Sequence, residues 1–174
     1  MMPEAITARF GGEPLARPPT APDHGTRSCW LLCRTGKFLC ALPIEHVIEI
    51  MRPLPVEQIA GAPHYVRGLS IIHGAPVPVI DLGLIVGDRA TASIRLVLIR
   101  AAARSIAITV DNVLGVSVIT GDALGELPPL LRDAAPDTIA AIGRLDNDLI
   151  IFLHVTRIVP ETVIGRLNAE KAAL

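Results

Sequence analysis

One histidine and one aspartate interrupt the apolar stretch VRGLSIIHGAPVPVIDL at residues 66–82, and both side chains transfer protons in enzymes. His73 and Asp81 are separated by two prolines, and no third group completes a catalytic set. An aspartate that follows an apolar run and precedes a turn usually caps that turn with its own carboxylate. We therefore predict that Asp81 stabilises the turn after the strand and that its substitution lowers stability.

The sequence contains no motif of a metal site, a serine nucleophile or a phosphate-binding loop. The five histidines show neither the i, i+4 spacing of a helical metal site nor the i, i+2 spacing of a strand site. No Gly-x-Ser-x-Gly motif surrounds a serine, and no glycine-rich loop is present that would bind a phosphate. The sequence therefore predicts no catalytic residue, no metal and no cofactor, and we expect a protein that is not an enzyme.

The chain has three cysteines, an odd number that argues against a framework of disulfides. Residues 28–42, SCWLLCRTGKFLCAL, are typical of two strands joined by a tight turn at 35–36. That register places Cys33 opposite Phe38 and diagonal to Cys40, which is poor geometry for a bridge. We expect buried, reduced thiols.

Composition limits the classes of function. The net charge of −1 and the aromatic content of 3% leave no footprint for nucleic acid. Although 51% of the residues are hydrophobic, no window of about 18 residues lacks both charge and proline, so we expect no membrane insertion. The N-terminus lacks the pattern of a signal peptide, and we expect a cytoplasmic protein. The apolar surplus indicates either a generous core or a surface meant for a partner protein.

Short runs rich in β-branched residues recur along the chain, as in SIRLVLI, SIAITV and NVLGVSVI. With the closing hairpin IGRLDNDLIIFL, they predict an all-β fold of about eight to ten strands, as a barrel or a sandwich. The fold should also contain one or two short helices. One of them is predicted at residues 43–51, PIEHVIEIM, where Val47, Ile50 and Met51 share a face. Pro76 and Pro78 lack amide donors, so we expect the chain to cross there between two small sheets.

Three segments fall outside this regular pattern. Residues 1–27 contain five prolines and predict a disordered tail. Residues 120–141 form a connection that is long for a compact domain, and so either functional or poorly ordered. Residues 164–174 predict a C-terminal tail.

The stretch at 66–82 resembles the signature of CheW-type chemotaxis coupling domains, in which Gly68, Gly74, Pro78 and Asp81 match in spacing. Three further stretches resemble the same family in the same order. LPIEHVIEIM is similar to the early helix of the family at Val47, Glu49 and Ile50. ITVDNVLGV is similar to the Val-Asp-x-Val stretch of the family at Val110, Asp111 and Val113. AIGRLDNDLIIFLHVTRI is similar to the closing hairpin of the family.

This resemblance implies two five-stranded β-barrels packed side by side over residues 28–163, with the chain crossing near residue 78 and returning after about 119. It implies a non-enzymatic adaptor that binds the cytoplasmic tip of a chemoreceptor and the regulatory domain of a CheA-like histidine kinase, with no cofactor. The partner-binding positions it implies are Val47, Glu49, Ile50, Gly68, His73, Gly74, Asp111 and Val113.

Two positions depart from the family pattern, because Ile71 stands where the family has Asn and His73 where it has Arg. The Arg position faces a partner in the family, and a histidine carries its charge only at mildly acid pH. Two hypotheses remain open. The chain is a divergent coupling protein for an unusual receptor, or a self-associating structural module that has lost receptor binding.

Overall fold

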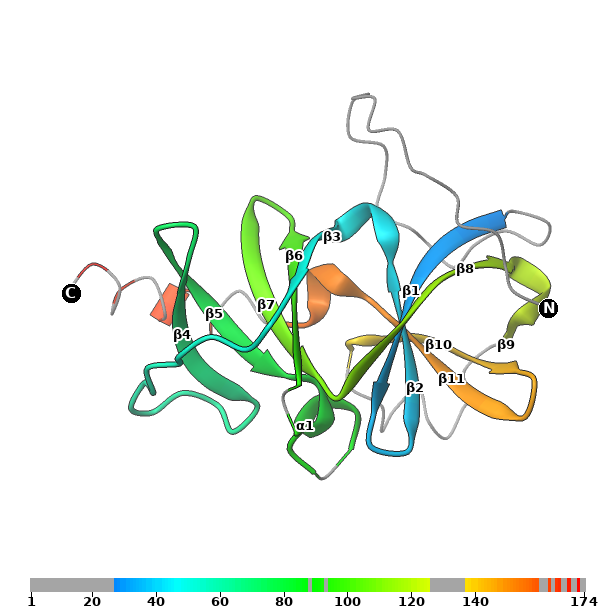
Figure 1. The fold of residues 1–174 in the computed structure, drawn as a ribbon, viewed down its shortest axis with the longest axis horizontal. Helices are drawn as coiled ribbons and strands as arrows, with labels where there is room; N and C mark the ends of the chain where they lie inside the picture. Colours follow the sequence, from blue (N-terminus) through cyan, green and yellow to red (C-terminus); the bar gives the residue numbers. More distant parts are fainter. Residues whose placement is uncertain are drawn as a thin grey trace.

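The computed structural model describes residues 27–87, 89–92, 94–125 and 137–159, and positions 163, 165, 166, 169 and 172. Within them, two sheets lie side by side, with the five-stranded sheet on the left of Figure 1 and the six-stranded sheet on the right. The six-stranded sheet has the order β8-β1-β2-β11-β10-β9 and consists of β1 (Arg27–Thr35), β2 (Phe38–Pro43), β8 (Asn112–Thr120), β9 (Leu124–Gly125), β10 (Ile139–Leu145) and β11 (Asp148–Leu153). The five-stranded sheet has the order β3-β6-β7-β5-β4 and consists of β3 (Val47–Met51), β4 (Val66–Ile72), β5 (Ala75–Asp81), β6 (Arg95–Ala101) and β7 (Arg104–Val110).

The helical segments whose two ends both lie within the described residues are short: α1 (Leu82–Val86) and the 3-10 turns η1 (Ile44–His46), η2 (Gly121–Ala123) and η3 (Val155–Arg157). The prediction of an all-β fold in two units with little helix is confirmed. In place of two five-stranded barrels, the described residues form sheets of six and five strands, neither of which closes on itself. In the part of the chain that the structure describes, no helix is long and apolar enough to cross a membrane.

The chain passes between the sheets at η1, after β2, and again at Asp111, between β7 and β8. The crossing predicted near residue 78 and the return after about 119 are therefore wrong, since β4 and β5 belong to the same sheet. Pro76 and Pro78 pair only with β4, whereas β7 pairs with β5 at residues 79–81. The prolines thus lie where β5 has a single neighbour, which is where a strand tolerates missing amide donors.

Residues 43–51 do not form the predicted helix. Only η1 is helical, and β3 follows it and pairs with β6 with a bulge after Val47. The bulge puts Val47 and Ile50 on the same side of the sheet, because their partners Ile99 and Val97 both belong to the core between the sheets. Apolar residues three positions apart therefore imitate the period of a helix in a bulged strand.

The β1–β2 hairpin turns at Gly36 and Lys37, one residue later than predicted, with φ of 56° at Gly36. This register places Cys33 directly opposite Cys40, so the predicted diagonal arrangement is wrong. Both thiols are free and buried as expected, whereas Cys29 is free and exposed. The predicted closing hairpin is confirmed as β10 and β11, which are joined by a turn after Leu145.

Apolar side chains pack on both faces of each sheet. The largest cluster lies between the sheets and includes Leu31 of β1 and Val97 of β6. On the other face of the six-stranded sheet, Trp30 packs edge-to-face on Phe152 with ring centroids 4.9 Å apart. The other face of the five-stranded sheet buries a third cluster around Val79. Two sheets with two covered faces each account for much of the apolar surplus in the composition.

Parts of the predicted irregular segments lie outside the described residues. The predicted tail at 1–27 is described only at Arg27, and the predicted long connection at 120–141 is described at both ends but not at 126–136. Its described ends form η2, β9 and the start of β10.

Candidate functional site

The turn between β4 and β5 carries His73 at its tip. His73 has φ of 50° and Gly74 has φ of 77°, so both residues adopt the left-handed backbone of a two-residue hairpin turn. Gly74 has open space around it, and its role in the structure is to permit this turn. The turn holds His73 and Ile71 in exposed positions near the end of the hairpin.

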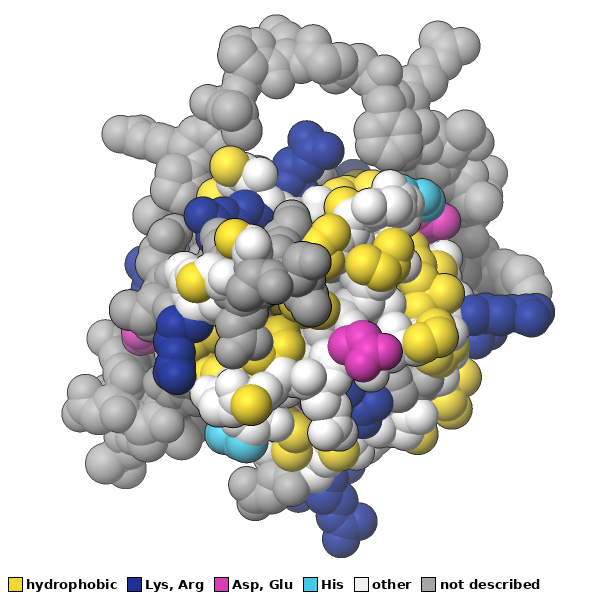
Figure 2. All heavy atoms as spheres, turned by 90° about the vertical axis from the view of Figure 1, so that its left-hand side faces the viewer, with side chains coloured by type: hydrophobic (Ala, Val, Ile, Leu, Met, Phe, Trp, Pro, Cys, Tyr) yellow, Lys and Arg dark blue, Asp and Glu magenta, His cyan; other side chains and the backbone are white. Residues whose placement is uncertain are grey.

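A contact between this hairpin and β3 brings two of the predicted residues together. Nε2 of His73 lies 2.7 Å from Oε2 of Glu49. On the elements that this contact joins, Ile48, Ile50 and Ile71 expose 43%, 41% and 65% of their surface. We call these five residues the β3–hairpin patch. Figure 2, which looks onto the end of the five-stranded sheet, shows hydrophobic side chains gathered beside an adjoining histidine and acidic side chain.

The contact between Glu49 and His73 contributes little to stability. Both side chains are exposed, and pairs of this kind contribute about 0–1 kcal/mol. The carboxylate of Glu49 has a partner in His73, and the other three residues of the patch are isoleucines. Exposed apolar side chains on neighbouring elements are typical of a surface that binds another protein.

Two predicted residues of the same region have structural roles. Val47 is half-buried and packs against the core between the sheets. Gly68 is buried with φ of 141°, and a Cβ added there would overlap the carbonyl oxygen of Glu57. That close approach belongs to a bridge in which the amides of Glu57 and Leu69 each donate to the other's carbonyl oxygen, at 2.8 and 2.9 Å. Gly68 therefore has a structural role in this bridge, and its place in a partner contact stays a prediction.

The predicted residues at the start of β8 lie elsewhere. Asp111 accepts hydrogen bonds from the amide of Gly36 at 2.6 Å and from the amide of Ala92 at 2.5 Å. It thereby fastens the second crossing between the sheets to the β1–β2 turn. Val113 packs against the core between the sheets. Neither residue belongs to the β3–hairpin patch.

The structure also reveals an apolar surface that the sequence analysis missed. Leu114, Val116 and Val118 are exposed on β8, and we call these three residues the β8 strip. In the part of the chain that the structure describes, β8 is an edge strand of the six-stranded sheet and pairs with β1 alone. The alternation of Val116 and Val118 in the sequence was the available signal, but alternation does not tell which face of a strand remains uncovered.

The profile of the CheW-like domain family matches residues 30–163, which is most of the chain. The chain belongs to the CheW-like domain family. The crystal structure of the scaffolding protein TtCheW from Thermoanaerobacter tengcongensis is similar in fold, with a TM-score of 0.64 and 22% sequence identity over 74% of this chain and 89% of that chain. No curated protein matches the sequence. The resemblance seen in the sequence motifs is thereby confirmed, and membership of this family supports the role of an adaptor or scaffold.

In this CheW-like domain, Asp81 caps the turn after β5, as predicted. Its side chain is fully buried, and Oδ1 accepts hydrogen bonds from the amides of Gly83 and Leu84 at the start of α1. The amide of Thr91 donates at 3.0 Å, and Nε of Arg67 lies 2.8 Å from Oδ2. Sequence reasoning missed Arg67 and Thr91, although a buried carboxylate needs such partners. One carboxylate thus joins β4, α1 and the segment before β6.

Burial shifts the pKa of two thiols and one histidine elsewhere in the CheW-like domain. Burial raises the pKa of the Cys33 thiol to about 12 and, with a smaller effect of Cys33, raises the pKa of Cys40 to about 12. Burial, and then the charge of Arg157, lowers the pKa of His154. Among the described residues, no three histidine, cysteine or acidic side chains lie close enough to hold a metal ion.

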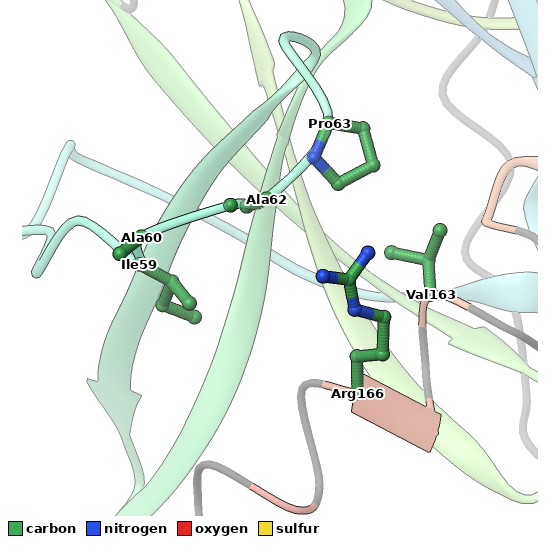
Figure 3. Close-up of a pocket in the computed structure, with 7 residues that line it drawn as sticks. Ile59, Ala60, Ala62, Pro63, Val163 and Arg166 are labelled. Atoms are coloured by element: carbon green, nitrogen blue, oxygen red, sulfur yellow. The ribbon is translucent and has the colours of Figure 1, made fainter.

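Two hollows of the CheW-like domain lie away from the predicted residues. One, of about 30 Å³, lies between the loop at 59–63 and the C-terminal segment, where Arg166 points toward the loop (Figure 3). It has room for little more than a water molecule. The other, of about 560 Å³, is open and is lined by parts of α1, η3 and the segment before β4. Neither hollow brings the predicted partner-binding residues together.

Proposed function

We propose that this CheW-like domain couples a chemoreceptor to a CheA-like histidine kinase, and that the β3–hairpin patch contacts the cytoplasmic tip of the receptor. The observation that carries the proposal is the contact between Glu49 and His73, with three exposed isoleucines on the two elements that it joins. Three residues expected to face a partner, Glu49, Ile50 and His73, lie in this patch. The regulatory domain of the kinase is the second proposed partner, because in the family that domain shares this fold.

The size of the patch fits a reversible contact. Ile48, Ile50 and Ile71 together expose the equivalent of about one and a half side chains. Full burial of one isoleucine contributes about 1.5–3 kcal/mol, so covering the three contributes about 2–4 kcal/mol. Alone, that amount corresponds to a dissociation constant of about one to tens of millimolar. An adaptor in an assembly gains further affinity from its second partner, since linked binding events reinforce each other.

The test is titration calorimetry with a purified cytoplasmic receptor fragment, followed by a pull-down with the kinase regulatory domain. Ile71→Asp buries a charge in the contact, and we expect it to weaken receptor binding by about tenfold or more. Leu149→Asp is the matched control, because Leu149 is a similarly exposed apolar residue on β11, outside the patch. Failure of the wild-type chain to bind either fragment would refute the proposal, as would equal binding by the two variants.

A further inference from the structure

β8 lies at an edge of the six-stranded sheet, and among the described residues this edge lacks the protections that the other three sheet edges have. β8 spans nine residues, Asn112–Thr120, and lies at an edge of the six-stranded sheet, where β1 is its only paired neighbour among the described residues. An edge strand presents alternate backbone amide and carbonyl groups that lack a partner strand. Exposed side chains of the β8 strip lie beside this edge. A long, apolar, unpaired edge is the geometry that accepts another strand.

Each of the other three edges is protected. The edge of β4 is covered by the bridge between Glu57 and Leu69, and by the hydroxyl of Ser70, which donates to the carbonyl of Pro55 at 2.8 Å. β3 is bulged and carries Glu49 in its ion pair. β9 has only two residues. Short edges, bulges and charges are the usual protections against strand pairing.

β8 has a bulge too, but at one end. Its register against β1 shifts between Leu32 and Cys33, which leaves Leu114 as the extra residue. From Gly115 to Thr120 the pairing with β1 is regular. The strand contains no charged residue along its whole length, so it lacks the residues that deter another strand.

We propose that two copies of this chain associate through β8, pairing antiparallel about a two-fold axis near Ser117. The uncharged character of the strand selects the partner, because a charged segment would lose its hydration against valines without gaining an opposite charge. The same strand of a second copy is uncharged and has the same alternation. In this pairing Val116 of one copy lies opposite Val118 of the other, and the reverse pair is identical by symmetry.

This inference is independent of receptor binding, because it uses the β8 strip and not the β3–hairpin patch. It assigns to a specific edge the self-association that the sequence left as an alternative. The two copies would extend the six-stranded sheet across the axis, which leaves the β3–hairpin patch of each copy on the other sheet.

The test is sedimentation velocity of the full chain over a range of concentrations. We expect a monomer–dimer equilibrium for the wild type, and dimerisation weakened by about tenfold or more in Val116→Lys and in Val118→Glu. When these two variants are mixed, the lysine of one lies opposite the glutamate of the other, so dimers should reappear. That recovery also shows that both variants are folded. Ile71→Lys, in the β3–hairpin patch, is the control that should dimerise like the wild type.

Three results would overturn the proposal. The first is a wild-type chain that stays monomeric at the highest attainable concentration, and the second is a dimer that Ile71→Lys disrupts while the β8 variants do not. The third is a mixture of the two β8 variants that remains monomeric although circular dichroism shows both to be folded. Loss of receptor binding with an intact dimer would instead count against the coupling function alone.

Discussion

Replacing Asp81 with asparagine tests whether one buried carboxylate holds three segments together. The fully buried Asp81 accepts hydrogen bonds from the amides of Gly83, Leu84 and Thr91, and it pairs with Arg67. An asparagine of the same shape turns one acceptor oxygen into an NH₂ group that points at other donors. It also removes the charge that balances the guanidinium of Arg67.

Removing one partner of a buried ion pair costs about 3–5 kcal/mol. The side chain of Arg67 is 31% exposed, so water reaches the guanidinium after the change, and we expect the lower end, about 3 kcal/mol. For a domain of this size, a loss of about 3 kcal/mol moves the midpoint of urea unfolding down by about 1–2 M. The measurement is urea unfolding followed by circular dichroism and by the fluorescence of Trp30, the single tryptophan of the chain.

The matched control is Asp148→Asn. Asp148 also pairs with an arginine, since Oδ2 lies 3.0 Å from a guanidinium nitrogen of Arg34, but both side chains are exposed. Exposed pairs contribute about 0–1 kcal/mol, so this variant should unfold close to the wild type. If Asp81→Asn loses no more stability than Asp148→Asn, the reasoning that the buried carboxylate organises the turn is refuted.

Three further predictions concern glycine geometry, thiol reactivity and acid stability. Gly68→Ala should lower the melting temperature more than Gly74→Ala. At Gly74 the positive φ alone costs roughly 1–3 kcal/mol, whereas at Gly68 an added Cβ also overlaps a backbone atom. Equal shifts of the two melting temperatures would contradict this. Ellman's reagent should label Cys29 alone in the native chain and all three thiols after unfolding, because burial raises the pKa of the other two to about 12; fast labelling of a second thiol would contradict this. The pKa of His154 is lowered in the folded chain, so the unfolded chain binds more protons and stability falls as the pH drops below the ordinary value of 6.5. His154→Gln should therefore lose less stability than the wild type between pH 7 and pH 5 in urea unfolding, and an identical pH dependence would exclude this role.

The sequence predicts local features of the fold well, because neighbouring residues determine them. The cap at Asp81 and the turn after Leu145 depend on a few adjacent side chains, and both are confirmed. Long-range pairing is different, since β2 pairs in parallel with β11 from the far end of the chain, and no local pattern encodes that choice. The prolines at 76 and 78 were misread for the same reason. They mark the edge character of one strand segment, which depends on where β7 stops pairing.

In the candidate site, too, the features that depend on neighbouring residues were easier to predict than those that depend on the packing of the two sheets. Glu49, Ile50 and His73 are exposed, as a partner contact requires, although Ile50 was expected on a helix rather than on β3. The β8 strip was missed because its valines alternate as in a strand with one covered face. Which face the second sheet covers depends on the packing of the two sheets, and that packing is absent from any single window of sequence.

The order of the strands has a consequence for synthesis of the chain on the ribosome. The five-stranded sheet is built from one continuous stretch, from β3 to β7, whereas the six-stranded sheet needs both the first two strands and the last ones. Domains tend to fold as their segments emerge during synthesis. The first hairpin therefore waits, with its apolar residues unpaired against β11, until the strand at Asp148–Leu153 has been translated. The interval before β11 arrives is the period in which the nascent chain most needs a chaperone.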